Sequence, residues 1–530
     1  MIFRIVVKYW CFLFFGLLVA NHASMAQLMQ TARYEVSHDW TDMPYLVVNN
    51  DKRGVTIVQP KVKGSAPEFE IKFDHLNRQL DVQWSGSFQV SSQMNLVGTH
   101  YSLQHTYLLF QNRINNKFFQ LVSLNLDDKN LIVFETKEII HINLQYFEMV
   151  QNIAILGGYR EDKPLVVAYN PEDGSVNTLE NIYQPNAELA EVRVNKDSVT
   201  FNVMTSVLND RKERTLVVHT FDYIGNYIRG YQLESKDEHQ LLTGVSSSIR
   251  DKAQLVTGLY TTKNGSYPSG LFVNHIDKTG VQTMNFYNFA IFDSFLNHLG
   301  EKRSERLKKK ARKKFKNGKD WRFKTDVFFR SMLENDNELL VTAEFFKPWS
   351  FSTENYNLNR FGLRRFSSFN SGRDDPYRPI NSSNYRAPRE FDFTHAFALS
   401  LSPNGEMNWD KSFTINSVHE GARDEFGAFQ WYEGQVYYSY YYRRELVAGH
   451  INGTDQNEIR TSLSLKEKDE ELKFNIDETF DFTRWYDNYI LIHGVQRVKS
   501  ADQKGKIRRV FFVNKLGFEP HFENEEVKKE

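Results

Sequence analysis

The chain repeats one pattern of hydrophobic and polar positions over most of its length. Each repeat has an apolar stretch of four to six residues, a turn rich in Asp, Asn and Gly, and a second extended stretch. β-branched and aromatic residues suit a pleated strand, and the turn residues supply the positive φ that a tight hairpin requires. The apolar stretches are 69–74, 119–124, 165–169, 216–221, 271–276, 397–401, 446–451 and 510–513.

The spacing of the turns indicates a repeat protein. The turn glycines are Gly174, Gly225, Gly280, Gly405, Gly453 and Gly517, separated by 51, 55, 125, 48 and 64 residues. Four of these five gaps lie near the roughly 40–50 residues of one four-stranded propeller blade. The fifth gap is about two blades long.

A second element, apolar-apolar-x-Gly in most of its copies, lies upstream of most turns. It occurs at 96–101, 155–159, 255–260, 339–344 and 490–495. Glycine in a strand marks a place where another backbone approaches closely. We expect this element to form the inner strand of a blade, next to the propeller axis.

Together these patterns predict an all-β fold, a single β-propeller with seven or eight four-stranded blades. Strands near residues 31–59 are expected to help close the ring, which removes the unpaired sheet edges that favour aggregation. The alternatives are an array of β-sandwiches or two separate β-domains.

Residues 1–26 have the layout of a secretory signal peptide. Arg4 and Lys8 precede a 12-residue apolar run, and Ser24 and Ala26 provide the small residues of a cleavage site. The run is shorter than the roughly 20 residues of a membrane-spanning helix. We expect cleavage after Ala26, a mature β-propeller domain at 27–530 and no transmembrane span in it.

Composition favours an exported bacterial protein. The single cysteine, Cys11, lies inside the signal segment, whereas secreted eukaryotic proteins of this size usually carry disulfides. The mature chain has 64 basic against 66 acidic residues, so its overall charge does not indicate nucleic acid as a partner. On its repeat pattern and leader, the chain resembles the broad class of exported bacterial β-propeller repeat proteins. The resemblance assigns no catalytic residue.

Residues 286–324 depart from the repeat and predict a helical insertion. Five apolar residues follow a helical period, with Gly300 as the expected C-cap. They are Phe289, Phe292, Phe295, Leu296 and Leu299. The segment 302–324 then contains 13 basic residues, with Leu307, Ala311 and Phe315 as a narrow apolar stripe.

This basic helix has two interpretations. In the first it docks onto an acidic partner, an anionic polysaccharide or a membrane surface as a peripheral contact, through Lys308, Lys309, Arg312 and Lys313. In the second it is a solvated insert that only packs against the propeller.

Residues 347–390 form the second departure, predicted as a long loop that lies with the helix between two blades. Arginine and aromatic residues interleave here, and the candidate binding residues are Arg364, Arg365, Phe366 and Tyr377. Loops of this length are often functional. We expect the two insertions to form one binding region, although an ordered loop covering one face of the ring is the alternative.

The sequence assigns no catalytic residue, metal site or cofactor. Phosphate-binding loops, His-Glu-x-x-His helices and Gly-x-Ser-x-Gly elbows do not occur. Only Glu344 and His493 are candidates for chemistry at the ends of inner strands. Asp74, Asp222 and Asp277 recur near turns, where Asp usually caps the turn.

The sequence therefore favours a non-enzymatic binding or scaffold protein of the periplasm or cell surface. One propeller face and the two insertions would contact an envelope protein or a polysaccharide. The rival hypothesis is a polysaccharide-acting hydrolase or lyase with its site in the propeller funnel.

Overall fold

The computed structural model describes residues 28–348 and 391–518, apart from short gaps in each range, the longest of which is 462–469. The predicted signal segment and residues 349–390 lie outside the described residues. Within the described part, no helix is both long enough and apolar enough to cross a membrane.

The protein is an all-β propeller with eight blades, as the sequence predicted. Each blade is an antiparallel sheet; in blades 1–7 the strands follow one another in chain order, and in blade 8 the N-terminal strand joins strands from the end of the chain. The chain divides into two units, one of which spans residues 38–426 and contains six blades. The other combines residues up to 37 with those from 427 onwards and contains two blades.

Blades 1–6 make up the larger unit. Blade 1 consists of β2 (Leu46–Asn49), β3 (Val55–Lys61), β4 (Glu68–Leu76) and β5 (Val82–Ser91). Blade 2 consists of β6 (Met94–Tyr101), β7 (His105–Asn112), β8 (Phe118–Asn125), β9 (Asn130–Val133) and β10 (Lys137–Glu138). Blade 3 consists of β11 (Asn143–Val150), β12 (Ile153–Arg160), β13 (Lys163–Tyr169) and β14 (Val176–Thr178). A short 3-10 helix, η1 (Asp51–Arg53), joins β2 to β3.

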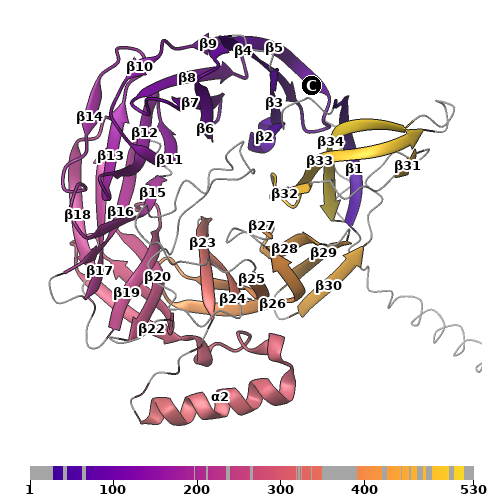
Figure 1. Cartoon of the computed structure of the whole chain (residues 1–530). Helices are drawn as coiled ribbons and strands as arrows, with labels where there is room; N and C mark the ends of the chain where they lie inside the picture. Colours follow the sequence, from indigo (N-terminus) through magenta and orange to yellow (C-terminus); the bar gives the residue numbers. More distant parts are fainter. Residues whose placement is uncertain are drawn as a thin grey trace, which may run out of the picture. The chain divides into compact units, whose positions relative to one another are not determined.

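Blade 4 consists of β15 (Ala187–Val194), β16 (Thr200–Leu208), β17 (Arg214–Asp222) and β18 (Tyr227–Leu233). Blade 5 consists of β19 (His239–Ser246), β20 (Gln254–Thr262), β21 (Gly270–Ile276) and β22 (Gln282–Asn288). Blade 6 consists of β23 (Asp326–Glu334), β24 (Leu339–Pro348), β25 (Phe391–Leu401) and β26 (Met407–Glu420). In Figure 1 the first strands β6, β11, β15 and β23 lie on the inner side of this unit, and the fourth strands β14 and β18 lie outside.

The smaller unit contains blades 7 and 8. Blade 7 consists of β27 (Ala428–Tyr432), β28 (Gln435–Tyr442), β29 (Glu445–Asn452) and β30 (Asp455–Thr461), and blade 8 of β31 (Glu470–Leu472), β32 (Phe480–Arg484), β33 (Ile490–Ser500), β34 (Ile507–Phe518) and β1 (Leu28–Ser37). The strand β1 pairs with β34 from Leu28 opposite Phe518 to Ser37 opposite Val510. The strand predicted near residue 31 therefore completes blade 8.

The eight apolar stretches found in the sequence are the third strands of the eight blades. Each lies between two other strands of its sheet, and in β13 and β21 nearly every side chain is buried. A strand that is buried on both faces has a continuous apolar sequence instead of an alternating one. This burial explains why the repeat is most visible at the third strand.

The glycine-containing element is not the innermost strand that we expected. Four of its five copies form second strands, and only the copy in β6 is a first strand. The first strand of blades 2–6 contains a β-bulge, which crowds the strand beside it. A Cβ on Gly158 would lie 2.1 Å from the Asn143 carbonyl oxygen, and one on Gly258 would lie 2.0 Å from that of Thr243.

The turns after the third strands of six blades share a polar cap, whose side-chain oxygen accepts a hydrogen bond from a backbone N–H within the turn. These caps are Asn77, Asn125, Asn170, Asp222, Asp277 and Ser402. The structural role expected of Asp222 and Asp277 is therefore confirmed. The expectation for Asp74 is wrong, because Asp74 lies within β4 and accepts a hydrogen bond from Ser85 Oγ at 2.5 Å.

The segment between blades 5 and 6 contains the predicted helix but begins differently. After β22 come two 3-10 turns, η2 (Phe289–Ile291) and η3 (Asn297–Leu299), and then α2 (Glu301–Lys316), which Figure 1 shows outside the strands. The α-helix expected over 289–299 is wrong. Of the three phenylalanines only Phe289 lies in a 3-10 turn, and the backbone is extended at Phe292. The rings of Phe289, Phe292 and Phe295 are all buried in the core with β24 and β25.

Gly300 is not the C-cap of an α-helix. Its φ is 78°, and its N–H donates to the Asn297 carbonyl, which closes η3. Its own carbonyl accepts from the N–H of Ser304 at 2.9 Å, which begins α2.

The second insertion also differs in position from the prediction. Residues 349–390 connect β24 to β25, which pair with each other inside blade 6. The insertion therefore lies within one blade and not between two. The sequence could not show this, because the hairpin is interrupted by more than 40 residues that lack the repeat pattern.

Candidate functional site

The helix α2 is attached to the larger unit through a small apolar face. Ser304 and Ala311 are buried, and the half-buried Leu307 packs against the core cluster that contains Phe289 and Phe295. Because most of these side chains are small, the helix lies close to the protein without burying much of itself. The predicted contacts of Leu307 and Ala311 are confirmed; the Phe315 side chain lies outside the described residues.

Polar contacts hold the segment before α2 on blade 6. The buried carboxylate of Asp410 accepts hydrogen bonds from the N–H of Asp293 at 2.9 Å and from the N–H and Oγ of Ser294, both at 2.7 Å. Ser412 Oγ donates to the Ser294 carbonyl at 2.7 Å. Lys308 Nζ then donates to the Asp293 carbonyl at 2.6 Å, so this predicted binding residue also anchors its own helix.

The outer face of α2 is predominantly cationic. The helix contains ten Lys and Arg residues against two Glu, and nine of the ten are exposed, including the predicted residues Lys309, Arg312 and Lys313. None of these nine forms an ion pair with another residue that the structure describes. Lys314 lies over the ring of Trp321 at 4.9 Å.

The exposed cations also repel one another. Residues four apart on a helix are neighbours, and like charges there destabilise it. Six such basic pairs occur in α2, among them Arg306 with Lys310 and Lys309 with Lys313. The helix keeps this arrangement because Leu307 packs on the core cluster around Phe289 and Phe295, and Lys308 donates to the Asp293 carbonyl.

The other predicted residues stay predictions. Arg364, Arg365, Phe366 and Tyr377 lie outside the described residues. The flanking strands are described, and Asp326, which begins β23 after α2, pairs with Phe346 near the end of β24.

Two histidines form a stacked contact between η3, the turn that leads into α2, and blade 6. The rings of His298 and His395 stack with centroids 4.1 Å apart, and His395 stacks on Phe345 at 4.5 Å. Burial lowers the pKa of His298 to about 4, with the cations Lys347 and Arg303 adding to the effect. Burial also lowers the pKa of His395 well below its ordinary value, helped by His298 and Lys347.

His395 is the more confined of the pair. It is 1% exposed, and its Nε2 has no hydrogen-bond partner among the described residues. The stack is therefore held by two neutral imidazoles. Protonation would place cations face to face beside Lys347 and Arg303 in a poorly hydrated contact.

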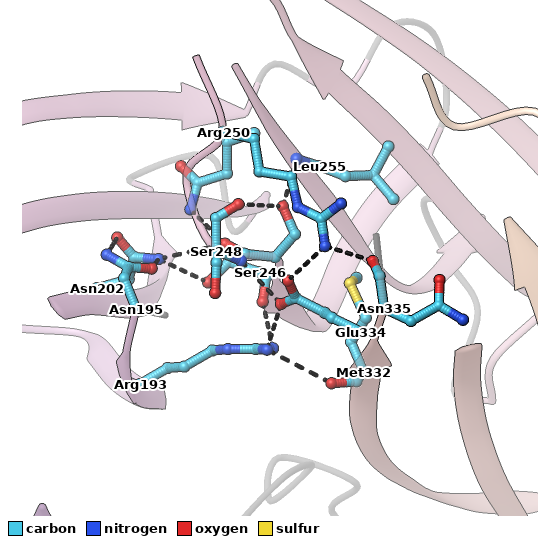
Figure 2. A network of polar contacts seen from close by, with 12 residues as sticks. Arg193, Asn195, Asn202, Ser246, Ser248, Arg250, Leu255, Met332, Glu334 and Asn335 are labelled. Carbon is cyan, nitrogen blue, oxygen red and sulfur yellow. Dashed lines mark hydrogen bonds and ion pairs between the residues drawn. The ribbon is translucent and has the colours of Figure 1, made fainter. Parts of the chain in front are cut away.

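A second polar cluster, which the sequence did not predict, lies where the first strands β15, β19 and β23 of three blades end. Figure 2 shows the Glu334 carboxylate between the guanidinium groups of Arg193 and Arg250. Glu334 forms an ion pair with Arg193, accepts from the Ser248 N–H at 2.8 Å and lies 3.6 Å from Arg250. Arg193 also donates to the Ser246 carbonyl at 2.5 Å.

This cluster joins three successive blades. Arg193 lies in β15 of blade 4, Ser246 and Arg250 lie in and after β19 of blade 5, and Glu334 ends β23 of blade 6. The Glu334 side chain is 1% exposed, and both of its oxygens lie next to cationic or N–H groups. Such a carboxylate is suited to holding blades together and not to exchanging protons with a substrate.

The described residues include both candidates for chemistry, Glu344 in blade 6 and His493 in blade 8. No group of three or more His, Cys, Asp or Glu in the described part of the chain is arranged to hold a metal ion. Glu344 is completely buried within blade 6. His493 is half-buried in blade 8, with its ring 6.3 Å from that of Phe511.

Comparisons with known proteins give the fold level only. No family model matches the chain, and no curated protein matches it. Among solved structures, the β-propeller domain of the Trilobed protease from Pyrococcus furiosus, described as having an open velcro topology, matches with 9% identity and a TM-score of 0.35 over 79% of this chain and 98% of its own.

Two further matches are of the same kind. A prolyl endopeptidase structure matches with 6% identity and a TM-score of 0.38, over 87% of this chain and 55% of its own. Hydrazine synthase from Kuenenia stuttgartiensis matches with 12% identity and a TM-score of 0.33, over 59% of this chain and 79% of its own. At these values the matches carry no argument about function.

Proposed function

We propose that this protein is a non-enzymatic binding or scaffold protein of the bacterial cell envelope. Its propeller acts as a rigid support that presents α2 to an acidic partner. The observation that carries the proposal is the set of nine exposed cations on a helix that packs on an apolar core and follows a segment anchored by Asp410 and Ser412. The location in the envelope rests on the predicted signal segment at 1–26.

The rival hypothesis of a polysaccharide hydrolase or lyase has less support. Most glycoside hydrolases use a pair of carboxyl groups on either side of the bond that they cleave. Of its two candidates, Glu344 is enclosed within blade 6, and His493 is half-buried in blade 8. Glu334 is already held by two arginines.

Charge reversal on α2 tests the proposal. The double variant K309E/K313E changes two exposed residues without touching the anchored face. The double variant K72E/K278E makes the same change of charge in exposed residues on blades 1 and 5 and is the matched control. Binding of the mature chain is measured against an acidic polysaccharide, poly-glutamate and anionic vesicles.

The expected result is binding to at least one polyanion that K309E/K313E weakens and K72E/K278E does not. The effect should shrink as salt rises, because the Debye length falls from about 30 Å at 0.01 M to about 3 Å at 1 M. Equal binding by both variants, or no binding to any of the three, would overturn the proposal.

A further inference from the structure

The exposed cations of α2 form a ridge along the helix. Lys302, Arg306, Lys309, Lys313 and Lys316 follow one another at intervals of four, three, four and three residues, and all five are exposed. With a rise of 1.5 Å per residue, neighbouring charges are about 4.5–6 Å apart along the axis and the ridge is about 21 Å long. A partner with regularly repeated negative charges would match this ridge.

The surroundings of the ridge favour a thin partner over a flat one. Arg303, Lys310 and Lys314 lie on one side of it and Arg312 on the other. At 100° per residue the exposed cations cover about 200° of the helix circumference. A flat surface can contact only part of this arc at one time, whereas a chain can lie along the ridge and bend towards either side.

A membrane is a poor match for this surface. Helices that bind bilayers do so by burying an apolar face among the lipids. In α2 the apolar positions Leu307 and Ala311 face the protein, and every exposed residue is Lys, Arg or Glu among the helix residues whose side chains the structure describes.

A folded protein partner is also a poor match. The centres of protein interfaces are rich in aromatic residues and arginine and poor in lysine. Seven of the ten cations in α2 are lysines, and the ridge contains no apolar anchor.

We infer that the partner is a linear polysaccharide that carries one carboxylate on each sugar, a polyuronate. The length of a sugar ring in an extended chain is close to the spacing of the ridge charges, so successive carboxylates can meet successive cations. Lysine suits this role because it is a compact point charge that does not require the fixed geometry of an arginine fork. The inference rests on the proposed function and adds the class of partner.

The probe is oligogalacturonate of defined length, titrated into the mature chain by calorimetry at low salt. Affinity should rise with chain length and level off near five sugars, the length at which one carboxylate can face each ridge cation. K309E/K313E should weaken binding by roughly tenfold or more, and K72E/K278E should leave it unchanged. Methyl-esterified oligogalacturonate keeps the chain but loses the charge, and it should not bind.

The other polyanions separate this inference from the proposed function. If oligogalacturonate does not bind, while poly-glutamate or anionic vesicles bind in a manner that K309E/K313E abolishes, the partner class is wrong and the proposed function stands. Binding of duplex DNA as tight as that of oligogalacturonate would also overturn the partner class. If K309E/K313E leaves the binding of every polyanion unchanged, both fail.

Discussion

Acidification should loosen η3, the turn that leads into α2, from blade 6. His298 and His395 stack in the contact between them, and burial lowers the pKa of both. In the unfolded chain a histidine has a pKa near 6.5, so the neutral stack stabilises the fold fully above that pH. This contribution is lost as pH falls towards the folded value. For His298, with a folded pKa of about 4, the loss amounts to about 3 kcal/mol at pH 4.

Hydrogen exchange over residues 301–316 measures this effect locally. After correction for intrinsic rates, protection of the α2 amides should fall between pH 7 and pH 4 in the wild type. The variant H298F/H395F keeps an aromatic stack but cannot be protonated, so its protection should not change. Other buried histidines also titrate in this range, because burial lowers the pKa of His75 and of His219 to about 4. An equal loss of protection in the double variant would assign the effect to those residues and refute the role of the stack.

Three further predictions concern stability and local order. Glu334→Gln should lower the free energy of unfolding in urea by about 3 kcal/mol, because it leaves Arg193 buried without its counter-charge. The control Glu138→Gln, in an exposed ion pair, should lower it by less than about 0.5 kcal/mol. Similar values for both variants would show that the network does not hold the blades. Gly258→Ala should lower the free energy of unfolding by more than about 2 kcal/mol, since its Cβ would meet a backbone oxygen at 2.0 Å. Gly434→Ala, which has open space around it and a φ of 74°, should lower it by about 1 kcal/mol. The reverse order would contradict the inference that the bulges in the first strands crowd the second strands. Asp410→Asn should raise exchange of the amides at 293 and 294 at neutral pH, and unchanged protection there would show that the carboxylate does not anchor the segment.

The sequence predicted those strands whose burial leaves a continuous apolar pattern. The third strand of every blade has this property, and the turn after it adds a recognisable cap such as Asp222 or Asp277. First strands were harder to recognise, because a bulge shifts the alternation of side chains halfway along five of them. Short outer strands such as β14 carry no apolar signal, since all three of its residues are exposed.

The candidate sites divide in the same way. The charge of α2 is a local property, and its sequence alone indicated a surface for binding. The cluster around Glu334 is not local, because Arg193 and Glu334 are 141 residues apart and meet only when three blades assemble. The stack of His298 on His395 also depends on contacts between separate segments. An isolated histidine at either position gives no signal of its neighbour.

The order of strands in blade 6 also links the two insertions more closely than their sequence positions do. The chain enters β23 from α2, runs to Glu334 and returns along β24. The last residues of β24 therefore lie beside the first residues of β23, at one end of the blade. Pro348 at the end of β24 pairs with Phe391 at the start of β25, so the chain leaves the blade before residue 349 and returns to it after residue 390 at that same end. In an antiparallel sheet the first strand begins at the same end of the sheet at which the second strand ends and the third begins. An insertion before the first strand and an insertion between the second and third strands are therefore attached at the same end of the blade. This geometry is the physical reason to test α2 and the segment containing Phe366 as one surface: if Phe366→Ala weakens oligogalacturonate binding without changing its salt dependence, the two insertions act together.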